Sequence, residues 1–369
     1  MRACARGPPG IRPGGRSLRV LEEWSRRLVV FTYAFAAVSF WIELVGGAWD
    51  IEWHLAGRAE FFWTMPHVVL YAGIGLTFAA CAGGLVLGLF GPPAPRGIQR
   101  GLRIALLGGL VKFAAGLFDA AWHARFGQDD ALSPPHLVMI AGMNVVGVGL
   151  IVGYSSLLRA KGFWRGIRGT WRGAAGVIAP VAGTAWLFAV LGFAWIFSHP
   201  GFIKDPLLPS EWQRTIVATT FAAILALVTM ASRGLLGLRW TGTALLSLYG
   251  ASVAALDVLM AQETAATFVA LPLFATSGLL MDLVFAVGRP GQERGFLVSV
   301  AGAIVGASTV VLLRIPTQDM TGGLFLNPPT ILAAYALGGV LGALAGLQVP
   351  RLLRVVIPVP KAAGAPDAP

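Results

Sequence analysis

Ten long apolar runs, separated by short polar connections, make up most of this sequence of 369 residues. Most of the runs are close to the roughly 20 residues that a helix needs to cross the hydrocarbon core of a bilayer. Only 12% of the residues are charged, whereas a soluble domain has about 25%, so the chain has too little polar surface to cover a globule in water. We therefore predict an all-α fold, a polytopic membrane bundle of about ten transmembrane helices in the lipid bilayer. The runs lie at about 28–47, 65–90, 104–118, 136–158, 174–197, 215–232, 242–262, 265–288, 295–313 and 330–348.

The lysines and arginines are distributed unevenly between the two sets of alternate connections. Twenty-two of them lie in the two tails and in every second connection, and five lie in the opposite connections. Because basic residues concentrate in cytoplasmic loops, we predict a multi-pass protein of the cytoplasmic (inner) membrane with both termini in the cytoplasm. The net charge of +11 is spread over these short clusters, a pattern that does not indicate nucleic-acid binding.

Four of the five histidines follow one spacing that occurs twice. Each copy reads D-x3-H-x12-H, with a Trp before the first His and a Pro before the second, and the copies lie 69 residues apart. The spacing predicts a tandem repeat of one helix hairpin, with both copies running in the same direction through the membrane. The two sets are Asp50, His54 and His67, and Asp119, His123 and His136.

The repeat lies in the N-terminal half, and no such motif occurs in the second half of the chain. Repeat 1 covers about 28–90 and repeat 2 about 100–158. The predicted parts are a basic cytoplasmic tail at 1–27, a duplicated metal-ligand hairpin region at 28–158, scaffold transmembrane helices at 174–348 and a cytoplasmic tail at 349–369.

Each copy offers two imidazoles and one carboxylate, the ligand composition of a reactive divalent metal site. The Asp and the first His are one turn apart on one helix face, and the second His follows a Pro-containing turn that begins the next helix. Folding the hairpin therefore brings the three ligands together, on the non-cytoplasmic side. Copper, iron and zinc all suit these ligands, and neither Cys4 nor Cys81 lies near them in the sequence. The alternative is that these residues only cap helix ends.

Five other charged residues are candidates for roles around the site. Glu43 and Lys112 lie seven residues before the Asp of each copy, and because a lone charge at this depth costs at least about 2.5 kcal/mol, we predict that they pair. Glu60 and Asp129 each lie six residues past the first His, and we expect them to orient an imidazole N–H. Asp257, near the outer end of its run, is an extra ligand, a proton carrier or a structural partner.

The segments 50–67 and 119–136 resemble one family, the copper-binding C subunit of particulate methane and ammonia monooxygenases. The resemblance is carried by the Asp, the Trp-His pair and the second His in the D-x3-H-x12-H spacing. It implies copper, O2 chemistry and the oxidation of a small apolar substrate within the membrane, together with partner subunits. Matched residue by residue, the implied copper ligands are Asp50, His54, His67, Asp119, His123 and His136.

Two other functions fit the same histidines. Paired histidines on membrane helices also serve as axial ligands of haem b, which would make the chain an electron carrier. A duplicated ligand set also suits a metal transporter or metal-delivery protein, in which the two sets act as a relay. Whether the chain is an enzyme, and whether it forms a homo-oligomer or assembles with partner subunits, stays open at this point.

Overall fold

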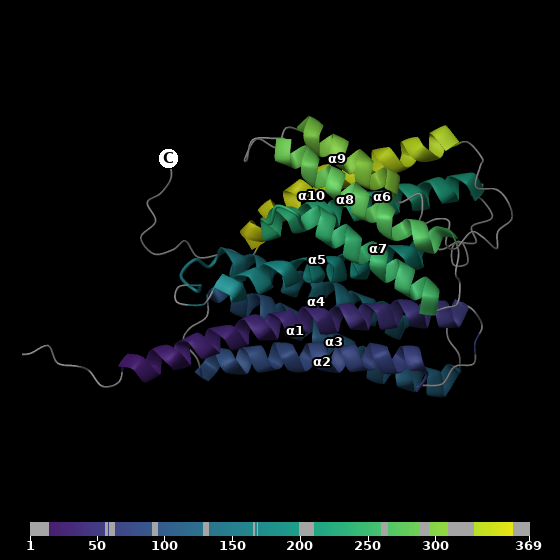
Figure 1. The fold of residues 1–369 in the computed structure, drawn as a ribbon. Coiled ribbons are helices and arrows are strands. Elements are labelled where there is room, and N and C mark those ends of the chain that lie inside the picture. Colours follow the sequence, from purple (N-terminus) through teal and green to yellow (C-terminus); the bar gives the residue numbers. More distant parts are fainter. Residues whose placement is uncertain are drawn as a thin grey trace, which may run out of the picture.

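The computed structural model describes residues 15–55, 58, 63–90, 95–127, 133–164, 167, 169–198, 210–259, 265–287, 295–308 and 328–356. Within these ranges the chain forms ten α-helices and no strand (Figure 1). The helices are α1 (Gly15–Leu55), α2 (Met65–Phe90), α3 (Arg96–Phe126), α4 (Pro134–Arg159), α5 (Gly169–Ser198), α6 (Ser210–Leu236), α7 (Thr241–Leu259), α8 (Ala265–Val287), α9 (Gly295–Ser308) and α10 (Pro328–Val356).

Each predicted apolar run coincides with one of these helices, which confirms the predicted all-α membrane bundle. Seven of the described helices contain an apolar stretch long enough to cross a bilayer. Three shorter apolar stretches lie in α7, α8 and α9. The seven longer stretches are Glu22–Ile51, Met65–Leu89, Arg96–Phe126, Pro134–Arg159, Gly169–Gly192, Thr219–Leu236 and Ala333–Leu353.

The helices lie side by side, with α1–α4 on one side of the bundle and α7–α10 on the other (Figure 1). Successive helices pack as the hairpins α1–α2 and α3–α4, and α2 packs against α3. Helix α5 contacts α1 and α4 as well as α6 and α7, so it joins the two halves. The repeated spacing of Asp and His residues described from the sequence falls in the first four helices.

The two N-terminal hairpins share the same close contact between their helices. In the first hairpin, a Cβ added at Gly73 of α2 would lie 2.6 Å from the Cα of Glu43 in α1. In the second, a Cβ added at Gly142 of α4 would lie 2.7 Å from the Cγ of Lys112 in α3. Both residues of the second contact lie 69 positions after those of the first, so the return helix crosses its partner at the same position in each hairpin.

A second contact, further from the site, repeats the same offset. A Cβ at Gly84 would lie 2.6 Å from Thr32 Cγ2, and a Cβ at Gly101 would lie 2.5 Å from Gly153 Cα. Thr32 and Gly101 are 69 positions apart, as are Gly84 and Gly153. The register of the two hairpins therefore agrees over about three turns of α2 and α4, from the site towards the opposite end of each helix.

Helices α1 and α3 run in the same direction without touching through their backbones. The Tyr33 hydroxyl of α1 donates a hydrogen bond to the Ile98 carbonyl of α3 at 2.5 Å, and Glu43 meets Lys112 further along both helices. Among the described residues, no Cα of α1 lies within 8 Å of a Cα of α3. Long side chains therefore connect these two helices across the first four-helix group.

Candidate metal centre

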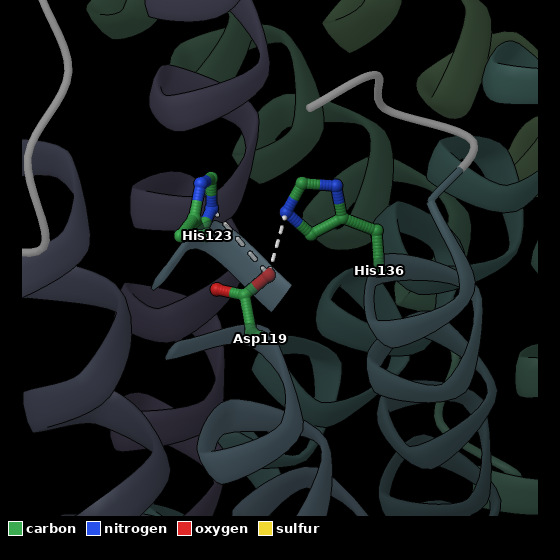
Figure 2. Close-up of side chains that lie close together, drawn as sticks. All are labelled: Asp119, His123 and His136. Carbon is green, nitrogen blue, oxygen red and sulfur yellow. Dashed lines mark ion pairs between the residues drawn. The ribbon is translucent and has the colours of Figure 1, made fainter. Parts of the chain in front are cut away.

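Asp119, His123 and His136 converge where α3 ends and α4 begins (Figure 2). Asp119 Oδ1 lies 3.6 Å from His123 Nε2 and 3.4 Å from His136 Nε2. These separations are too long for good hydrogen bonds. They match the roughly 3.3–3.6 Å between neighbouring ligand atoms that share one tetrahedral ion at bonds of about 2.0–2.2 Å. The three residues therefore have the types and the spacing to hold one metal ion.

Local sequence explains how α3 and α4 present these side chains. Asp119 and His123 are four residues apart, so they share one face of α3. Helix α3 stops at Gly127, whose φ of 79° is a positive value that glycine adopts without strain. Two prolines, at 134 and 135, begin α4 and place His136 in its first turn.

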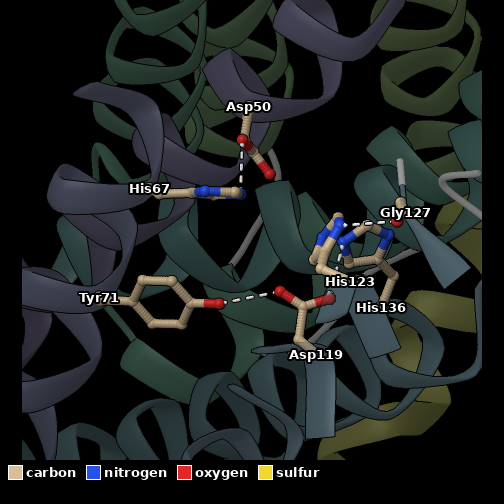
Figure 3. Close-up of polar contacts among 7 residues, drawn as sticks. All are labelled: Asp50, His67, Tyr71, Asp119, His123, Gly127 and His136. Atoms are coloured by element: carbon tan, nitrogen blue, oxygen red, sulfur yellow. Dashed lines mark hydrogen bonds and ion pairs between the residues drawn. The ribbon is translucent and has the colours of Figure 1, made fainter. Parts of the chain in front are cut away.

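The backbone carbonyl of Gly127 orients the His123 ring. His123 Nδ1 lies 3.2 Å from the Gly127 oxygen (Figure 3). A carbonyl oxygen only accepts hydrogen bonds, so a proton on Nδ1 suits this contact, and in the neutral tautomer that carries it Nε2 offers a lone pair on the side of Asp119. A lone pair facing a carboxylate oxygen is unfavourable by itself, and a cation between the two satisfies both.

The other oxygen of Asp119 receives a hydrogen bond from the first hairpin. The Tyr71 hydroxyl of α2 donates to Asp119 Oδ2 at 2.9 Å (Figure 3). Asp119 itself is buried, with 1% of its surface exposed. Its two oxygens therefore face different groups, the phenol on one side and the two imidazoles on the other.

In the first set, Asp50 and His67 are in direct contact. His67 Nε2 lies 3.1 Å from Asp50 Oδ1, and both side chains are buried (Figure 3). The first hairpin thus brings its second His back to its Asp. The backbone of His54 belongs to α1, and its side chain lies outside the described part of the chain.

The two sets lie next to each other and form one layer of polar side chains. The rings of His67 and His123 are 6.4 Å apart between centroids, and those of His123 and His136 are also 6.4 Å apart. The Tyr71 ring lies 5.8 Å from that of His67. Groups from both hairpins therefore border the second set.

Deeper in the bundle, Lys112 and Glu43 form the predicted ion pair. The Lys112 ammonium donates to both oxygens of Glu43, at 2.7 and 2.5 Å, and neither residue has exposed surface. The ammonium also lies 5.0 Å from the centroid of the Phe40 ring. These contacts give the pair a structural role, joining α1 to α3 about two helical turns below the two Asp residues.

Three predicted residues lie outside what the structure describes. Glu60 and Asp129 lie in connections that are not described, and Asp257 lies in α7 with a side chain that is not described. Their predicted roles near the site therefore stay predictions.

Tyr71 and Asp282 are polar residues whose roles the sequence did not reveal. Tyr71 is four residues after His67, so its place on the same face of α2 could have been read from helical spacing. The Asp282 carboxylate of α8 accepts hydrogen bonds from the N–H of Thr243, at 2.8 Å, and of Gly242, at 3.3 Å, at the start of α7. It also lies 3.5 Å from Arg233 Nε, so it joins α8 to the start of α7 and to the end of α6.

Comparison with known proteins gives this chain no relative: no family model, no curated protein and no solved structure matches it. The resemblance to the copper monooxygenase subunit therefore stays a prediction that rests on two short segments.

Proposed function

We propose that this chain is an integral membrane metalloprotein that binds a transition-metal ion through Asp119, His123 and His136. The observation that carries the proposal is the convergence of one carboxylate oxygen and two imidazole nitrogens at 3.4 and 3.6 Å. The hydrogen bond from His123 Nδ1 to Gly127 supports it, because metal-binding histidines usually donate their other N–H to such a group. Three protein ligands leave further coordination positions for water, oxygen or a substrate.

We propose that the two hairpins arose by duplication and that the first set, in the first hairpin, is a metal site equivalent to the second set. It offers the same ligand types, Asp50, His54 and His67, in the same spacing. The matched register of the two hairpins supports the duplication. If both sets are loaded, two ions lie close together on one side of the membrane.

Copper is the proposed metal, ahead of iron and zinc, on the basis of the family resemblance. Bound copper would supply one-electron chemistry with O2. The proposed activity is therefore that of a monooxygenase-like oxidoreductase acting on a small apolar substrate within the bilayer. The charge distribution supports a site on the non-cytoplasmic side, and electrons would come from a partner protein or a small reductant.

Haem b is less well supported than a single ion. Two axial histidines bind haem iron from opposite faces of the porphyrin, so the macrocycle lies between their rings. Here Nε2 of His123 and Nε2 of His136 both lie within 3.6 Å of the same oxygen of Asp119. That arrangement suits one small cation.

Metal transfer is a second candidate function, and one observation favours it. The rings of His67, His123 and His136 follow one another at 6.4 Å between centroids. Such a row allows an ion to pass from one set to the next. This candidate predicts movement of metal without oxidation of a substrate.

The first test is the metal content and visible spectrum of the full chain purified in detergent after expression with copper, iron and zinc. We expect one or two equivalents of copper. His123→Ala and His136→Ala should each weaken Cu²⁺ binding by more than about 100-fold, since loss of a direct ligand exceeds the effect of losing a supporting residue. Leu117→Ala, at an exposed neighbour on α3, is the matched control and should bind like the wild type.

Each alternative gives a different result in this test. A Soret band would show that the protein binds haem b and not a single metal ion. Copper transport into vesicles, without copper-dependent O2 consumption, would favour metal transfer. The proposed metal site would be wrong if the wild type and His123→Ala were equally well folded and neither contained copper, iron or zinc.

A further inference from the structure

We infer that Tyr71 is a positioning residue of the metal centre, holding Asp119 so that it binds the ion through a single oxygen. The inference rests on the proposed metal site at Asp119, His123 and His136. It adds that the second-hairpin centre is incomplete without the first hairpin, because Tyr71 belongs to α2.

The first observation is that the two carboxylate oxygens of Asp119 contact different groups. Oδ2 accepts the phenol hydrogen bond at 2.9 Å, and Oδ1 is the oxygen nearest to His123 and His136. A carboxylate with one oxygen engaged by a donor presents the other to a cation. The phenol thereby fixes both the rotation of the carboxylate and the number of oxygens that it offers.

The Tyr71 ring is held in place by its surroundings. A Cβ added at Gly116 would lie only 2.9 Å from Tyr71 Cε1, so the ring lies directly over bare backbone of α3. Gly116 is three residues before Asp119, which puts it on the same side of the helix, one turn away. On its other side the ring borders His67 at 5.8 Å between centroids. This packing of the Tyr71 ring directs its hydroxyl at Asp119.

The first hairpin and the second hairpin differ at this position. The residue 69 positions after Tyr71 is Ile140, whose side chain has no donor for Asp50. Correspondingly, His67 Nε2 lies 3.1 Å from Asp50 Oδ1, closer than either imidazole comes to Asp119. The phenol is therefore a difference between the two hairpins at corresponding positions.

Removing the phenol should change both the affinity and the coordination of the ion. In Tyr71→Phe, Asp119 loses its donor and both of its oxygens become available to the metal. Loss of a residue that orients a ligand typically weakens metal binding by about 10–100-fold. A change from one to two bound oxygens raises the coordination number, and this weakens and shifts the visible absorption of bound Co²⁺.

The experiment is a titration of the full chain in detergent with Cu²⁺ and, separately, with Co²⁺, following affinity and visible spectrum. The variants are Tyr71→Phe and Gly116→Ala, which should displace the ring. The matched control is Tyr33→Phe, which also removes a buried phenol hydrogen bond, from Tyr33 to the Ile98 carbonyl at 2.5 Å, without touching a carboxylate.

The expected result is a 10–100-fold loss of affinity and an altered Co²⁺ spectrum in Tyr71→Phe, a similar change in Gly116→Ala, and neither in Tyr33→Phe. If Tyr71→Phe does not fold, Gly116→Ala gives the same readout. A wild-type affinity and spectrum in both site variants, with binding lost in His123→Ala, would overturn the role of Tyr71 alone. A wild-type chain that binds neither ion would overturn the metal site and this role together.

Discussion

The Lys112 ammonium reaches both carboxylate oxygens of Glu43, at 2.7 and 2.5 Å, across two helices whose backbones do not touch. Both residues are fully buried, with the Phe40 ring against the ammonium. The attraction between the two charges is therefore barely weakened by water. The pair fixes how far apart α1 and α3 lie, two turns below the candidate metal centre.

Breaking this ion pair should destabilise the protein strongly. Glu43→Ala or Lys112→Ala leaves one uncompensated charge at the centre of the bundle, and such losses cost about 3–5 kcal/mol. The exchange Glu43→Lys/Lys112→Glu keeps one charge of each sign and should recover much of the loss. Thermal unfolding in detergent and the yield of folded protein measure these effects.

The control for the ion pair is Leu110→Ala, at an exposed position on the same helix. It should unfold close to the wild-type temperature. Equal stability of the two single Ala variants, the exchanged variant and the control would show that the pair does not hold the hairpins together.

The packing of α10 against α6 should tolerate no side chain at Gly342. A Cβ there would overlap the Ala223 carbonyl oxygen of α6, because the two atoms would lie much closer than van der Waals contact allows. Gly342→Val should therefore separate the helices and cost about 1–3 kcal/mol, the usual range for overpacking. The comparison is Gly75→Ala on α2, where nothing lies within 4 Å of the new Cβ. That change should stabilise the protein by about 0.5–1 kcal/mol, and destabilisation of equal size in both variants would contradict this account.

The Asp282 carboxylate should be more important for stability than for metal binding. It accepts hydrogen bonds from the Thr243 hydroxyl and the Thr243 N–H, both at 2.8 Å, and is paired with Arg233. Asp282→Ala removes the cap of α7 and should cost about 2 kcal/mol or more. Asp282→Asn retains an acceptor and should cost less. Copper affinity, measured alongside thermal unfolding, should stay at the wild-type value, and a selective loss of metal would show that Asp282 has another role.

Chemical labelling of single cysteines checks the predicted orientation. In a Cys4→Ser background, where Cys81 is buried, Arg58→Cys places a thiol at an exposed position between α1 and α2. Lys161→Cys does the same between α4 and α5. In intact cells a membrane-impermeant maleimide should label Arg58→Cys, and Lys161→Cys should require permeabilised cells. The reverse pattern would place the candidate metal centre on the cytoplasmic side.

The helices could be predicted from the sequence because few backbone conformations are stable in lipid. Every backbone polar group within the hydrocarbon region must be hydrogen-bonded inside the protein, so an apolar run of this length becomes a helix. The predicted run at 104–118 corresponds to α3, which continues to Phe126 and thereby includes Asp119 and His123. The spacing of Asp119 and His123 already predicts that this helix continues past its apolar run.

The site could be predicted only where neighbours in sequence decide the geometry. Asp119 and His123 meet because helical spacing puts them on one face, and His136 follows from a short turn. Tyr71 and Asp119 lie 48 positions apart, and their contact depends on how α2 crosses α3 at Gly116. The pairing of Asp282 with the start of α7 likewise depends on tertiary packing, which no local pattern of residues reveals.

The ion pair has a consequence for how the two hairpins could have assembled. Two copies of the first hairpin, arranged like the present pair, would bring two carboxylates together at the centre of the bundle, and two copies of the second would bring together two ammonium groups. Like charges at this depth repel strongly and lack compensation. Glu43 and Lys112 therefore make each hairpin selective for the other, so that the connected chain favours a single asymmetric pairing over self-association of either half.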